Sequence, residues 1–187
     1  MKNILTTLPL FALAGCLIAH PPEAAEWTVE SAAAPVAAAK PKYGLVRVSF
    51  VAVRAPYDTR RIAVARPDGS LAFDAFNVFA SPPSQLLKGP VVDALAASGR
   101  FKAVVGPSSS AAADCLVEVT VNRLRLDFRE EGKRLAEAAV SLTLLDSSRN
   151  IAAYAQGDAS ADTADGNFSA AFSRALDSAL AKALSAL

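Results

Sequence analysis

Apolar and polar residues alternate along much of the C-terminal three-quarters of the chain. In the first of these stretches Val46, Val48 and Phe50 alternate with Arg47 and Ser49. A period of two residues is typical of a half-buried β-strand. Stretches of this alternating pattern, separated by turn residues, predict strands at residues 45–53, 61–66, 70–76, 101–105, 116–128, 136–146 and 150–158.

Two segments instead show the helical period of 3.6 residues. The first begins at Ser81-Pro82-Pro83 and runs to about Ser98, and Pro90 is expected to kink or split it. The second, at residues 165–187, repeats Phe, Ala and Leu at spacings of three and four. Together these elements predict an α+β fold, with an antiparallel-dominated sheet and two helices packed on one face.

The N-terminus has the features of a bacterial lipoprotein signal. Lys2 precedes an uncharged, mainly apolar stretch that contains Leu13-Ala14-Gly15-Cys16. This stretch, residues 4–19, is shorter than the roughly 20 residues that a membrane-spanning helix needs. Leu-Ala-Gly-Cys resembles the lipobox, in which the cysteine is acylated and becomes the first mature residue. Residues 1–15 are therefore predicted to be a lipoprotein signal peptide, and Cys16 the lipidation site.

The residues that follow suggest where this lipoprotein is held. Leu17 is not the aspartate that, by resemblance to lipoprotein sorting, retains lipoproteins in the inner membrane. We therefore expect an anchor in the outer membrane, facing the periplasm, with the inner membrane less favoured. Residues 16–43 are rich in Ala and Pro and are predicted to be a lipid-anchored tether that reaches roughly 90–100 Å when extended. Trp27, within it, is expected to contact either lipid or the folded domain, residues 44–187.

The composition offers little material for catalysis. Lysine and arginine number 19 and aspartate and glutamate 18, and this near-neutral balance lacks the footprint of a general nucleic-acid binder. The single histidine, His20, precedes the predicted domain, which excludes Ser-His and Cys-His pairs within it. No metal-ligand cluster or phosphate-binding glycine loop is present. A Ser-Lys or carboxylate pair stays open, although no motif points to one. Cys115 is predicted to be a small buried residue.

Arg123, Arg125 and Arg129 alternate with apolar positions near the end of the strand predicted at 116–128. They are expected to project from the face opposite the core. That face is either solvated or in contact with an acidic partner or lipid headgroups.

Four stretches of the domain, residues 60–66, 71–87, 95–101 and 113–119, together resemble a known family. They combine an Arg- and Ile-containing strand, an aromatic strand, an aromatic-Ala-x-Pro-Pro run, and Leu-x-x-Ser-Gly-x-Phe. The ordered series resembles the ABC-type transport auxiliary lipoproteins, the PqiC-like group that accompanies MCE-domain lipid transporters. Phe79 stands where a tryptophan usually precedes the Ala-x-Pro in that group.

The resemblance implies a non-catalytic accessory lipoprotein without a cofactor. It would work beside an MCE-domain subunit, its permease and its ATPase, which move phospholipid or other hydrophobic cargo, and would dock the MCE assembly to the outer membrane. A lipid-binding domain, or an envelope-assembly lipoprotein with an unrelated partner, is the alternative, and homo-oligomers stay open. The surface expected to bind the partner comprises Tyr57, Arg60, Arg61, Phe73, Phe76 and Phe79.

Overall fold

The computed structural model describes residues 23–34, 41–163 and 165–187, so Cys16 and His20 lie outside the described residues. The predicted strands are all present, with ends that differ by up to four residues. They are β2 (Tyr43–Val53), β3 (Arg61–Ala65), β4 (Leu71–Phe79), β5 (Phe101–Val105), β6 (Cys115–Asp127), β7 (Leu135–Leu145) and β8 (Ile151–Asp162). A further strand, β1 (Ala25–Trp27), was not predicted.

The strands form one eight-stranded mixed sheet around β6. On one edge β6 pairs antiparallel with β7, which pairs antiparallel with β8. On its other edge β6 pairs in parallel with β2 and, near its C-terminal end, with β3. β5 extends β2 in parallel, and β4 pairs antiparallel with β3. The sheet is therefore mixed and not antiparallel-dominated as predicted, although most of its paired residues, in the β6–β7, β7–β8 and β3–β4 ladders, are antiparallel. β2 and β5 run the same way because the chain between them crosses over through helices.

Three helices occur among the described residues, where two were predicted: α1 (Pro83–Leu86), α2 (Lys88–Ala97) and α3 (Phe168–Ser185). Leu87 separates α1 from α2, whereas Pro90 lies in the first turn of α2, where its missing N–H has no helical partner to lose. Gly99, with φ of 66°, follows α2 in the left-handed conformation that ends helices. None of the helices in the described part of the chain is long and apolar enough to cross a membrane.

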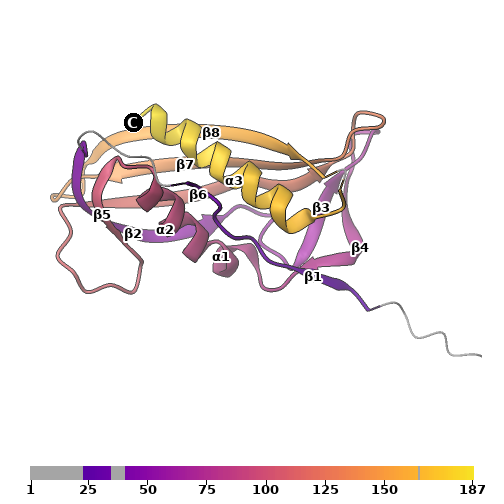
Figure 1. Cartoon of the computed structure of the whole chain (residues 1–187), viewed down its shortest axis with the longest axis horizontal. Helices are drawn as coiled ribbons and strands as arrows, with labels where there is room; N and C mark the ends of the chain where they lie inside the picture. The colour runs from indigo at the N-terminus through magenta and orange to yellow at the C-terminus, as the bar shows by residue number, and fades with distance from the viewer. Residues whose placement is uncertain (1–22, 35–40, 164) are drawn as a thin grey trace, which may run out of the picture.

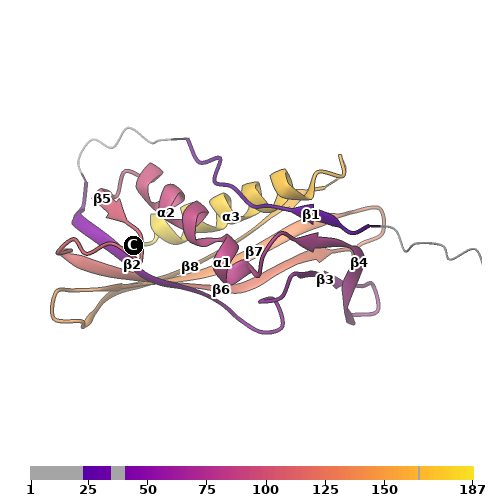
Figure 2. The same cartoon turned by 90° about the horizontal axis from the view of Figure 1, so that it is seen from below.

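The core lies between the sheet and α3, which runs along β7 and β8 with α2 beside it (Figures 1 and 2). The 3.6-residue repeat of α3 marks its buried face, which includes Phe172, Ala175, Leu176, Ala179, Leu180, Ala183 and Leu184. β8 presents Ala155 and Gly157 to this helix. A Cβ atom on Gly157 would overlap the backbone of α3, so glycine permits the close approach of strand and helix.

Residues 25–34, predicted to be part of the tether, belong instead to the folded domain; we call them the N-terminal strap. β1 adds to the edge of the sheet in parallel with β4. The Trp27 ring packs 5.3 Å from that of Phe168 at the start of α3, and its indole Nε1 donates to Asn77 Oδ1 at 2.9 Å. Of the two expected contacts of Trp27, the structure therefore shows the one with the domain.

The second half of the strap runs alongside α3. Val29 is buried, and the N–H of Glu30 donates to Ser173 Oγ at 3.0 Å. The carboxylate of Asp177 accepts from Ser31 Oγ at 2.9 Å and from the next backbone N–H at 2.8 Å. The strap is thus held at both of its ends, by β4 and by the middle of α3.

Candidate partner-binding surface

The residues predicted to bind a partner all lie on or just before the β3–β4 hairpin, but their environments differ. Phe79, at the end of β4, is 1% exposed, and its ring packs edge-on against Phe172 of α3 at 5.2 Å between centroids. Tyr57, in the β2–β3 loop, is half-buried and packs against the core. Phe79 is therefore a core residue and offers no side-chain surface to a partner, because β4 turns this position towards α3.

Two adjacent arginines have different roles in the hairpin. Arg60 Nε donates to the carbonyl of Phe79 at 3.0 Å, and the Arg60 guanidinium pairs with Glu26 of the strap. Arg60 thus ties β1 to β4. Arg61 lies over the ring of Phe73, with 5.0 Å from its guanidinium carbon to the ring centroid. Arg61 is exposed and Phe73 half-buried, so this cation–π pair presents both a charge and an aromatic face.

Phe76 projects from an interruption of the β3–β4 ladder. The register passes from Ala63 opposite Phe73 to Arg61 opposite Val78, so β4 carries extra residues at this point. Asp74 Oδ1 stabilises the bulge by accepting from the N–H of Phe76 at 2.8 Å and from that of Asn77 at 2.9 Å. The Phe76 side chain is 57% exposed. The backbone that carries this exposed ring is therefore fixed.

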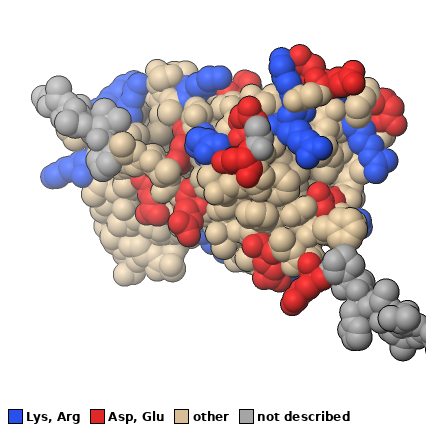
Figure 3. All heavy atoms as spheres, turned by 45° about the vertical axis from the view of Figure 1, so that its right-hand side comes forward, with Lys and Arg blue, Asp and Glu red and all other residues tan. Residues whose placement is uncertain are grey.

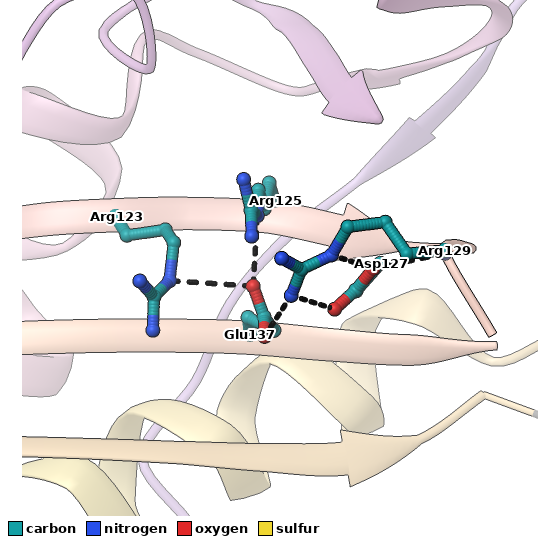
Figure 4. Close-up of polar contacts among 5 residues, drawn as sticks. All are labelled: Arg123, Arg125, Asp127, Arg129 and Glu137. Carbon is teal, nitrogen blue, oxygen red and sulfur yellow. Dashed lines mark hydrogen bonds and ion pairs between the residues drawn. The ribbon is translucent and has the colours of Figure 1, made fainter. Parts of the chain in front are cut away.

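Three arginines in and just after β6, Arg123, Arg125 and Arg129, are paired with two acidic residues on the same face (Figure 4). Glu137 of β7 lies 2.7 Å from Arg125 Nε, 3.3 Å from Arg123 Nε and 3.6 Å from an Arg129 nitrogen. Arg129 also pairs with Asp127 at 2.6 Å. The side chains of Arg125 and Glu137 are only 15% and 13% exposed. The carboxylates of Glu137 and Asp127 thus stabilise the three arginines, which do not form a freely solvated positive surface.

The Arg129 pairing predicts an acid-sensitive contribution to stability. Hydrogen bonds from the Arg129 side chain hold the pKa of Asp127 well below its ordinary value. A carboxylate with a depressed pKa in the folded state stabilises the protein above its unfolded pKa of about 3.9, and the contribution is lost as pH falls through the folded pKa. We expect Asp127→Asn to lower the free energy of unfolding at neutral pH, and the deficit to shrink progressively below about pH 4.

Urea unfolding from about pH 7 down to about pH 2.5 measures this effect. Glu131→Gln is the matched control, because Glu131 is an exposed carboxylate in the turn that follows β6, and it should cost little at any pH. A deficit for Asp127→Asn that stays constant with pH would show that the charge of Asp127 contributes nothing.

Cys115 opens β6 and is buried, as predicted, and burial raises the pKa of its thiol. A thiol of this kind is a packing residue. Within the described ranges, no group of three or more His, Cys, Asp or Glu side chains is placed to hold a metal ion. A hollow of about 280 Å³ lies between α2, α3 and the end of the strap, and its lining includes Ala33, Ala94, Ala97, Leu180 and Leu184.

Comparison with known proteins assigns this chain to a family. The sequence profile of the ABC-type transport auxiliary lipoprotein component matches residues 27–186. The chain belongs to this family, as its sequence resemblance predicted. The match begins at Trp27 and so includes most of the strap. Among curated protein sequences, no match is found.

Two solved structures share the fold. Protein XCC0632 from Xanthomonas campestris, described as a member of the DUF330 family, is 22% identical with a TM-score of 0.67, over 87% of this chain and 93% of that one. An uncharacterized protein is 14% identical with a TM-score of 0.58, over 84% and 90% of the two chains. At these identities the likeness extends to the fold alone.

Proposed function

We propose that the chain is a non-catalytic periplasmic lipoprotein, anchored in the outer membrane through acylated Cys16, that docks an MCE-type assembly of an ABC transport system to that membrane. The cargo would be phospholipid or another hydrophobic molecule. Family membership carries the proposal, since it establishes an auxiliary lipoprotein of an ABC transport system. Leu13-Ala14-Gly15-Cys16 supports the anchor. ATP hydrolysis would belong to the partner ATPase.

The Arg61–Phe73 pair is the part of the hairpin best suited to bind a protein partner, and Tyr57 precedes Arg61 by four residues in the β2–β3 loop. Arginine and aromatic residues dominate the binding energy of protein interfaces, and a cation–π pair offers both kinds of contact. Arg60 is engaged with the strap, and Phe79 is buried. We therefore assign the partner contact to Tyr57, Arg61 and Phe73. The hollow between α2 and α3 falls below the roughly 300–1,000 Å³ of ordinary ligand pockets. A larger hollow of about 580 Å³ beside the β6–β7 turn is lined mostly by the charged Lys133, Arg134 and Asp162, which do not suit an acyl chain, so docking stays the proposal.

Affinity purification of the full-length lipoprotein from its native membranes tests the proposal. We expect an MCE-domain protein and its permease to co-purify, and Arg61→Ala to lower their recovery about tenfold, the effect of about 1.4 kcal/mol. Arg174→Ala is the matched control, because it removes an exposed arginine from α3 instead. Cys16→Ala should release the protein from the membrane.

Two outcomes would contradict the proposal at different levels. Unchanged recovery with Arg61→Ala would reject the binding surface but not the role. If no transporter subunit co-purifies with the wild-type protein under mild detergent, the docking role itself is wrong.

A further inference from the structure

The N-terminal strap determines where the chain leaves the domain. Ala25 lies opposite Asn77 in the parallel β1–β4 ladder. Because the strands are parallel, the chain that precedes Ala25 departs towards Phe76, the residue before Asn77. β1 begins near the end of the molecule that also holds the β3–β4 hairpin (Figure 1). Any anchor upstream of the strap is therefore attached beside the bulge that carries Phe76.

The strap also shortens the connection to the anchor. Nine residue steps separate Cys16 from Ala25, and a fully extended chain spans at most about 3.6 Å per residue, or about 32 Å in all. The tether predicted from sequence, with roughly 90–100 Å of reach, would allow any face of the domain to approach the membrane. A connection of about 30 Å attached at one end instead favours one orientation.

The end of the domain beside this attachment is suited to a lipid surface. Phe76 is 57% exposed on its fixed bulge, and Leu71, at the start of β4, is 39% exposed. Exposed Lys, Arg, Asp and Glu side chains are interspersed on the face that Figure 3 brings forward, so no single sign of charge dominates it. Phe and Leu side chains insert at the boundary between headgroups and acyl chains, and a contact made by an anchored domain gains from the high effective concentration of the membrane.

We propose that Phe76 is a second membrane contact, which inserts into the lipid surface that holds Cys16 and so orients the domain on the membrane. The inference rests on the acylation of Cys16 in the proposed function. It separates two uses of one hairpin: Phe76 faces lipid, while Arg61 and Phe73 are left to the protein partner. Phe76, which was predicted from the sequence to bind the protein partner, is in this way assigned to lipid instead.

Tryptophan fluorescence in vesicles with brominated acyl chains tests the contact. The full-length acylated protein is reconstituted in brominated phosphatidylcholine as wild type, Phe76→Trp and Ile151→Trp. The wild type gives the emission of Trp27 alone, and subtracting it from the emission of each variant leaves the emission of the added tryptophan. Ile151 is 70% exposed at the start of β8, which lies at the opposite end of the molecule from β1 (Figure 1), and is the matched control. We expect the emission added by Phe76→Trp to be quenched and shifted to shorter wavelength, and that added by Ile151→Trp to be unquenched.

Equal quenching of the two added emissions, or none in either, would overturn the proposal. The proposal would also be overturned if the added emission of Phe76→Trp were not quenched by the brominated lipid and shifted only when the transporter subunits are added, since that result identifies a protein contact. Intact mass of the purified protein reports acylation of Cys16 separately. If acylation is absent, the proposed anchor fails, and coupling Cys16 to a maleimide lipid headgroup still tests whether Phe76 reaches the bilayer.

Discussion

Gly157→Ala is expected to lower the free energy of unfolding by about 3 kcal/mol, at the upper end of the range for overpacked sites. The added Cβ would overlap the carbonyl oxygen of Ala179 and lie 2.7 Å from the backbone nitrogen of Ala183. Neither atom can move aside by a change of rotamer, so α3 must shift away from β8. For a domain of this size the loss corresponds to a fall in Tm of about 6–12 °C.

Gly89→Ala is the matched control for this substitution. Gly89 lies in the first turn of α2, and no atom falls within 4 Å of the Cβ it would gain. Alanine is the better helix former, so we expect Gly89→Ala to raise stability by about 0.5 kcal/mol. Thermal unfolding of both variants provides the comparison. A Tm for Gly157→Ala within a degree or two of the wild type would show that β8 and α3 are not as closely packed as the structure has them.

The local elements could largely be predicted from the sequence because their patterns are local. β5 has the predicted bounds, and the repeat in residues 165–187 identified the buried face of α3. Asn167 caps that helix by accepting a hydrogen bond from the backbone N–H three residues on. The close contact of Gly157 with α3 could not be predicted, because it depends on two segments more than twenty residues apart.

Strand direction and the strap are the points at which the sequence-based prediction was wrong. The helical segment before the strand at 101–105 was a usable signal, because β5 pairs in parallel with β2 and parallel neighbours require a crossover connection. β1 had a much weaker signal: three residues within an Ala- and Pro-rich segment, paired with a strand about fifty residues away. Trp27, a large aromatic residue in a supposed tether, was the hint that this segment packs.

The candidate surface was predicted only in part, for a related reason. Alternation along β4 separates its two faces, but the bulge held by Asp74 interrupts the alternation between Phe73 and Val78. Three phenylalanines that looked equivalent in sequence are therefore half-buried, exposed and buried, in the order Phe73, Phe76 and Phe79. Resemblance to a family identified the hairpin, and only the fold shows which of its rings are available.

Phe79→Ala is expected to lower the free energy of unfolding by about 3–5 kcal/mol, because it removes a buried ring from the contact with Phe172 and leaves a cavity. Phe76→Ala removes the same side chain three residues earlier, from an exposed position. Its cost should stay within about 0.5 kcal/mol. Urea unfolding of the two variants against wild type measures the difference. Similar costs for the two would contradict the burial of Phe79.

Phe79→Leu separates a packing role from a binding role at the same position. Leucine keeps much of the buried volume, so this variant should fold, with a loss of about 1–1.5 kcal/mol. If Phe79 acts through packing alone, the folded variant will recover the transporter subunits as well as wild type does, whereas Arg61→Ala will recover fewer at unchanged stability. A folded Phe79→Leu variant that loses its partner would instead place Phe79 in the binding surface. The two measurements together therefore assign each of these neighbouring residues to the core or to the interface.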